Sequence, residues 1–133
     1  MQGISGIVYL ILIASLLPYL FAIIAKMAGG FKAKDNQNPR AFLASTTGLA
    51  ARAHAAQQNS FESLPLFIAS LLIAEYMVVV PHDTMMTLGW AYIVFRVGYG
   101  ICYLSNWATL RSILWLLSML CPIFLLILTI RFS

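Results

Sequence analysis

The chain has 133 residues, of which 62% are hydrophobic and only 9% are charged. Soluble domains carry about a quarter charged residues, so this composition predicts a membrane protein, and the length leaves no room for a separate soluble domain. The net charge of +4 comes from scattered basic residues that form no basic face or stripe, so nucleic acid is not an expected partner.

Four apolar segments approach the roughly 20 residues that a membrane-spanning helix requires. The first covers residues 4–25, and the basic residues that begin a signal peptide do not precede it, so we interpret it as a spanning helix. With the flanking helix-forming residues, we predict helices at about residues 4–27, 41–80, 84–104 and 110–131. The expected fold is an all-α membrane protein, a bundle of four transmembrane helices that forms one domain over residues 1–133.

The connection after the first helix contains the signals that end one helix and start the next. Gly29 and Gly30 end the first helix, and Pro39 can begin the following element. Helix-forming residues dominate from Ala41 onward, so the second helix is predicted to start there, with Gly48 as its weak point. Its first half is polar, and only its second half is apolar enough to cross a membrane.

The basic residues predict the orientation in the membrane. Only Arg131 lies on one side, and the other side carries Lys26, Lys32, Lys34, Arg40, Arg52 and Arg111. The positive-inside rule then places both termini outside and the basic connections in the cytoplasm. Because no endoplasmic retention signal ends the sequence, we expect a bacterial inner membrane.

Polar residues gather where the second spanning segment begins. The stretch from Arg52 to Glu62 contains Arg, His, Gln, Asn and Glu side chains. Ionisable groups at this depth are costly, so they usually face a bundle interior, a cavity or a ligand. At about 100° per residue, Arg52 and Asn59 point nearly the same way, and Glu62 lies on the adjoining flank.

The third and fourth helices repeat this arrangement. Arg96, Tyr99 and Tyr103 are spaced by three and four residues, so they form one stripe on the third helix. Arg111 and Ser112 open the fourth helix after a short turn. These side chains are predicted to converge with Asn59 and Glu62 on one site near the cytoplasmic end.

Simpler interpretations exist for each group. Glu62 could serve only to neutralise Arg96 or Arg111, and Arg111 could be only a positive-inside anchor. The tyrosines could belong to an interfacial aromatic belt. Cys102 and Cys121 lie within apolar helices, where thiols behave as small hydrophobes. Two cysteines without clustered histidines cannot form a zinc site, so no metal is expected.

Two motifs resemble the MAPEG family, the membrane-associated proteins of eicosanoid and glutathione metabolism. The first consists of Arg52-Ala-His54, Asn59-x-x-Glu62 and Leu64-Pro-Leu-Phe67. The second is Arg96-x-x-Tyr99-x-x-x-Tyr103, followed by Arg111-Ser112, which is similar to the catalytic arginine-serine pair of one branch.

The resemblance implies a homotrimer among membrane lipids, with glutathione as the thiol cosubstrate between neighbouring subunits. It implies that Arg111 and Ser112 are catalytic, with Arg111 favouring the thiolate. The residues implied to bind glutathione are Arg52, Asn59, Glu62, Arg96, Tyr99 and Tyr103. The implied function is a glutathione-dependent transferase, with peroxidase activity as a second reaction, acting on a lipophilic electrophile or hydroperoxide from the bilayer.

Two positions depart from the family pattern. Ala55 stands where relatives carry an arginine, and Ser63 stands where an aromatic residue is common. Fewer cationic contacts to the carboxylates of glutathione are expected, which leaves open a different thiol or a non-catalytic lipid-binding or scaffold protein of the same fold. A small transporter or proton relay is a third alternative, although the chain lacks the inverted repeats of many transporters.

Overall fold

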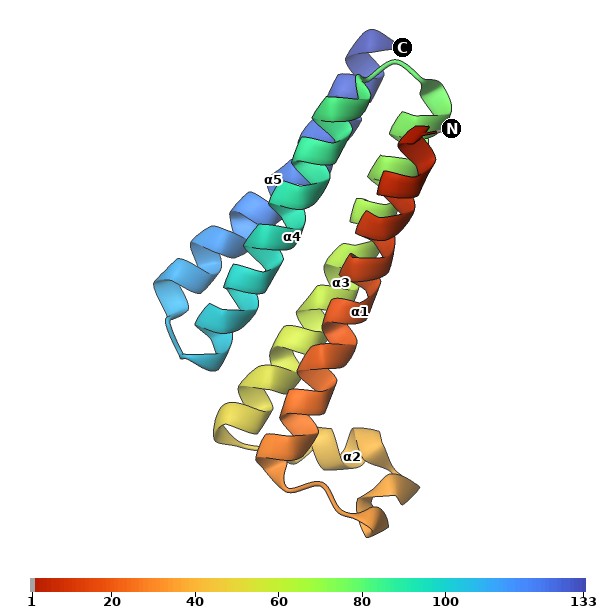
Figure 1. Ribbon diagram of the computed structural model, residues 1–133. Coiled ribbons are helices and arrows are strands. Elements are labelled where there is room, and N and C mark those ends of the chain that lie inside the picture. The colour runs from red at the N-terminus through yellow and green to blue at the C-terminus, as the bar shows by residue number, and fades with distance from the viewer. Residues whose placement is uncertain (1) are drawn as a thin grey trace.

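Four long helices form one elongated bundle in the computed structural model, which describes residues 2–133, with side chains from Ile4 onward (Figure 1). They are α1 (Gln2–Gly29), α3 (Gly48–Met77), α4 (His82–Leu104) and α5 (Ala108–Phe132). A 3-10 helix η1 (Ala33–Gln37) and a short helix α2 (Pro39–Ala44) connect α1 to α3. Residues 2–133 contain no strand, so the all-α prediction is confirmed.

The outer surface of the bundle is apolar. On α1, five large aliphatic side chains are each 51–55% exposed: Val8, Leu12, Leu16, Leu20 and Ile23. Each of the four long helices is long and apolar enough to cross a membrane. Lipid tails are the solvent that such a surface requires, so the chain is an integral membrane protein.

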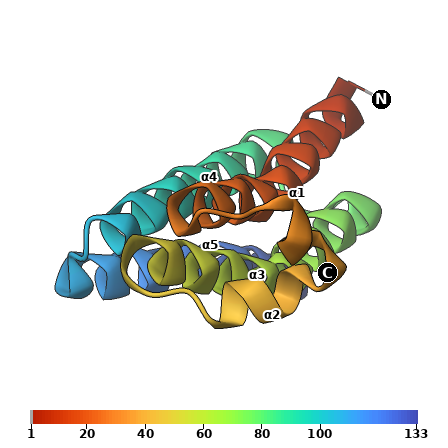
Figure 2. The same ribbon diagram turned by 90° about the horizontal axis from the view of Figure 1, so that it is seen from below.

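Both termini lie at one end of the bundle (Figure 1). We call the opposite end, which carries residues 30–47 and the turn 105–107, the loop end. There α2 packs beside the start of α3, as the view from below shows (Figure 2). The loop end carries most of the basic residues.

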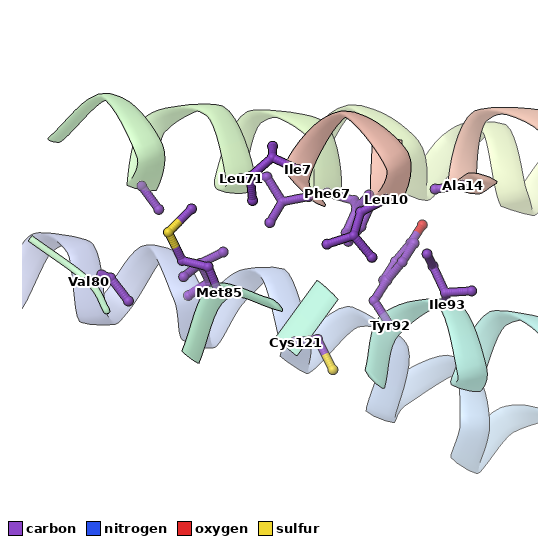
Figure 3. Close-up of a cluster of buried hydrophobic side chains, with 12 residues drawn as sticks. Ile7, Leu10, Ala14, Phe67, Leu71, Val80, Met85, Tyr92, Ile93 and Cys121 are labelled. Atoms are coloured by element: carbon purple, nitrogen blue, oxygen red, sulfur yellow. The ribbon is translucent and has the colours of Figure 1, made fainter. Parts of the chain in front are cut away.

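The main apolar core fills the half of the bundle nearer the termini. Ile7, Leu10, Leu71 and Met85 are almost fully buried there (Figure 3). The ring of Phe67 stacks on that of Tyr92 with centroids 4.0 Å apart. The large aliphatic side chains pack at this end, and the polar residues singled out by the sequence lie in the half towards the loop end.

The second predicted helix is broken, and this part of the prediction was wrong. Instead of one helix over residues 41–80, the structure has α2, which begins at Pro39, and α3, which ends at Met77. Thr46 Oγ1 donates to Leu43 O at 2.6 Å and so satisfies a carbonyl at the end of α2. Gly48 then has φ +59, a left-handed conformation that glycine adopts without strain. The other three helices extend beyond their predicted ends by no more than two residues.

Close packing of α4 against α1 leads to a stability prediction. A Cβ atom at Gly100 would lie 2.1 Å from Cζ of Phe21. Phe21 is only 4% exposed, so its ring cannot move aside without disturbing the core. We expect Gly100→Ala to lower the free energy of unfolding by about 1–3 kcal/mol, as overpacked core substitutions do.

Gly98→Ala is the matched control, because its nearest neighbour, Cδ1 of Leu114 at 3.1 Å, is the end of a flexible side chain. Alanine favours helix over glycine, so this variant should be as stable as the wild type or more stable. Thermal unfolding in detergent micelles measures both variants. Equal midpoints for Gly100→Ala and the wild type would contradict this view of the packing.

Candidate functional site

A polar pocket of about 250 Å³ opens between α3, α4 and α5 in the half towards the loop end. Its lining residues are Asn59, Tyr99, Tyr103, Arg111, Ser112 and Trp115. None of these side chains is acidic. The structure therefore brings together five of the residues that the two motifs singled out, and it adds Trp115, one helical turn beyond Arg111.

Alternating aromatic rings and guanidinium groups form the wall of this pocket. The guanidinium carbon of Arg111 lies 4.5 Å from the ring centroid of Tyr103. The rings of Tyr103 and Tyr99 meet edge to face with centroids 5.6 Å apart. Arg96 lies over Tyr99 at 4.2 Å, so the spacing of three and four residues on α4 becomes a continuous column that ends at Arg111. Such contacts hold a guanidinium in place without neutralising it.

Arg96 lies behind the pocket and is only 1% exposed. Its Nη2 donates to Asn59 Oδ1 at 2.8 Å and to Ser60 Oγ at 3.1 Å. Its Nη1 donates to Ser118 Oγ at 3.4 Å, and its Nε has no partner among the described residues. These acceptors are all neutral, so hydrogen bonds to uncharged groups and the contact with the ring of Tyr99 hold the buried cation.

Ser60 and Ser118 are the parts of this network that the sequence did not reveal. Ser118 follows Arg111 by seven residues and so shares its face of α5. This spacing was the one sequence signal that could have placed Ser118 near the site. It is a weak signal, because serines also occur in membrane helices for packing alone.

Arg52 and Glu62 lie outside the pocket of the single chain. Nη2 of Arg52 donates to the carbonyl of Leu104 at 3.3 Å, where it binds the C-terminal end of α4. Glu62 is exposed on the outer surface of α3. Since Arg96 donates only to neutral groups, the simpler interpretation of Glu62 as its neutralising partner gains no support.

The hydroxyl of Ser112 is engaged within its own helix. Its Oγ donates to the carbonyl of Ala108 at 3.1 Å. To donate to a ligand, this side chain must rotate away from the carbonyl, whereas Arg111 is already directed to the pocket wall. Arg111 is therefore the primary cation of the site, and Ser112 an auxiliary group.

An apolar groove of about 420 Å³ runs along the seam of α4 and α5. It is lined by Leu88, Phe95, Leu117, Leu120, Cys121, Ile123, Phe124 and Ile127. Leu117 of the groove is two residues from Trp115 of the polar pocket, so the two spaces lie at a similar level of α5 but on different faces of the helix. An alkyl or acyl chain matches this groove chemically.

The pocket suits the binding of an anion. A half-buried guanidinium stays charged, and it favours the thiolate over the thiol when a sulfur lies beside it. The amide and hydroxyl groups around it supply hydrogen bonds that fix a polar ligand. The donor set of the pocket thus fits a small anionic ligand.

The sequence model of the MAPEG family matches residues 6–131, which is nearly the whole chain. No individual curated protein matches the chain.

Proposed function

Because the chain belongs to the MAPEG family, we propose that it is a glutathione-dependent membrane transferase that also has peroxidase activity. The family includes both kinds of enzyme. One observation supports the proposal most strongly. Arg111 lines the same pocket as Asn59, Tyr99 and Tyr103, and none of the described residues that line it is acidic. The second substrate is a lipophilic electrophile or hydroperoxide that enters from the bilayer.

Arg111 activates the thiol of glutathione in this proposal. Its guanidinium stabilises the thiolate, which is the nucleophilic form. In the transferase reaction, the sulfur attacks an electrophilic carbon, a C–S bond forms, and the leaving group departs with its electron pair. With a hydroperoxide, the sulfur attacks the terminal oxygen and the O–O bond breaks. The products are an alcohol, after protonation, and a sulfenic acid, which a second glutathione reduces to yield glutathione disulfide and water.

The proposed assembly is a homotrimer with glutathione between neighbouring subunits. Glu62 supports this, because a carboxylate exposed on a membrane helix requires a partner or a ligand. In the trimer, Glu62 would meet the amino group of glutathione, and Arg52 would reinforce the end of α4 near the interface. We also propose that the membrane is a bacterial inner membrane. By the positive-inside rule, the site then faces the cytoplasm, with both termini outside.

A non-catalytic lipid-binding or scaffold protein is the second candidate function. The apolar groove between α4 and α5 favours it, as does Ala55 in place of a family arginine. Arg52 does not substitute for that arginine within the single chain, since it is bound to Leu104 O. Such a protein would hold an acyl chain in the groove and leave the polar pocket without a reactive thiol.

Turnover assays on the detergent-purified protein distinguish the two functions. We expect glutathione conjugation to a lipophilic electrophile, and reduction of a lipid hydroperoxide, with rates that saturate in glutathione. A folded protein that turns over neither substrate, and that copurifies with a lipid, would support the scaffold function instead.

A further inference from the structure

Arg96 and Asn59 are in contact at the back of the polar pocket. Asn59 belongs to the lining, whereas Arg96 is buried behind it. The 2.8 Å hydrogen bond from Arg96 Nη2 ends on the side-chain oxygen of Asn59. A guanidinium has five donors and no acceptor, so only the oxygen of the amide can face it.

This contact determines which end of the Asn59 amide is offered to a ligand. With its oxygen held by Arg96, the nitrogen is left with two hydrogens to donate. Arg96 is itself held by Ser60, Ser118 and the ring of Tyr99, so it cannot turn to release the amide. The side of the pocket formed by α3 therefore presents donors, as does Arg111 on the side formed by α5.

We propose that Arg96 is a positioning residue that turns the Asn59 amide nitrogen into the pocket, so that Asn59 recognises a carboxylate of the bound thiol and rejects its ammonium group. The proposal rests on the proposed function, in which glutathione is the thiol. Glutathione carries two carboxylates and one ammonium group, and a donor cannot bind the latter. The exposed carboxylate of Glu62, one helical turn from Asn59, is then the nearby anionic group that suits the ammonium.

Asn59→Asp tests the polarity of this contact, because it replaces the donating nitrogen by a charged acceptor of the same shape. An aspartate still accepts from Arg96, so the variant should fold. A carboxylate facing the carboxylate of glutathione should weaken binding about tenfold or more. If Asn59 instead bound the ammonium group, the same change would tighten binding, and if its role were only structural, affinity would not change.

Asn38→Asp is the matched control. Asn38 Oδ1 accepts from Ala41 N at 3.1 Å at the start of α2, and an aspartate preserves this cap while adding the same charge at the loop end. Its affinity for glutathione should equal that of the wild type. Binding is measured by calorimetry on the full chain in detergent, with thermal unfolding as the check on folding.

Two analogues identify the carboxylate: the glycyl ethyl ester of glutathione and the analogue without the α-carboxylate of its glutamyl residue. The loss caused by Asn59→Asp should disappear with one of them and persist with the other. In Arg96→Gln, the glutamine can donate to or accept from Asn59, so the amide of Asn59 is no longer held in one orientation. This variant should show a smaller preference for glutathione over the analogue that lacks the recognised carboxylate.

Each result decides the matter. The proposal is supported if Asn59→Asp binds glutathione more weakly than the wild type and if this loss of affinity disappears with one of the two analogues. Unchanged or tighter binding by Asn59→Asp, or an equal loss of affinity with both analogues, overturns the proposal. The proposed function still stands in that case, provided that the wild type binds glutathione. A folded wild-type protein that binds no glutathione overturns both.

Discussion

Replacing Arg111 by alanine is expected to slow glutathione conjugation about 100- to 1,000-fold, the loss typical when one donor to a developing or stabilised anion is removed. The guanidinium lies over Tyr103 at the wall of the pocket, and among the described residues no other cationic side chain lines that pocket. Without it, the thiol of glutathione would remain mostly protonated at neutral pH. The fold should survive, because Arg111 lies at the start of α5 and outside the apolar core.

Two further variants make this result interpretable. Arg111→Lys keeps the charge but loses the planar fork that stacks on a ring, so an intermediate rate is expected. Arg131→Ala removes an exposed arginine from the last turn of α5, far from the pocket, and should leave the rate unchanged. Steady-state rates at saturating electrophile are the measurement. A fully active Arg111→Ala protein would remove Arg111 from the proposed mechanism.

Arg96→Ala is expected to have the largest effect on stability of any change in the polar half, a loss of about 2–5 kcal/mol, the range found for truncation of large buried side chains. The substitution empties the space of a side chain that is 1% exposed. It also leaves Asn59 Oδ1 and Ser60 Oγ without their donor. Unpaired buried polar groups add to the loss.

Arg96→Met separates the packing of this residue from its hydrogen bonds. Methionine fills much of the volume and removes the cost of burying a charge, but it leaves the same acceptors without a donor, so this variant should unfold at a temperature between those of Arg96→Ala and the wild type. It should still bind glutathione weakly, because Asn59 loses the contact that orients it. Denaturation midpoints and glutathione affinity, measured on both variants, test the two roles. Equal stability of Arg96→Ala and the wild type would contradict the buried network.

The sequence predicted the fold well where hydrophobic length alone decides the structure. The spans around α1, α4 and α5 are long apolar runs bounded by glycine, proline or polar turns, and their positions follow directly. The break between α2 and α3 was missed because it depends on side-chain bonds of Ser45 and Thr46 to nearby carbonyls. Such bonds compete with helix formation only when the surrounding packing favours them.

Helical spacing predicted which residues of the candidate site share a face of one helix, but it did not predict the contacts between helices. The stripe of Arg96, Tyr99 and Tyr103 lies on one helix, so periodicity placed these residues on one face. The bonds from Arg96 to Ser60 and Ser118 join residues 36 and 22 positions apart, which no local pattern specifies. The orientation of Arg52 towards Leu104 O, rather than towards the pocket, is likewise a property of how α3 packs on α4. The family resemblance, in contrast, was confirmed over residues 6–131.

Titrating glutathione into the purified protein, and following the ultraviolet absorbance of its thiolate, tests most directly whether the pocket activates a thiol. We expect a thiolate signal that saturates with the wild type and is lost with Arg111→Ala, while both proteins remain folded. The absence of a thiolate signal from a folded wild-type protein, or an equal signal from the variant, would contradict the proposed role of Arg111.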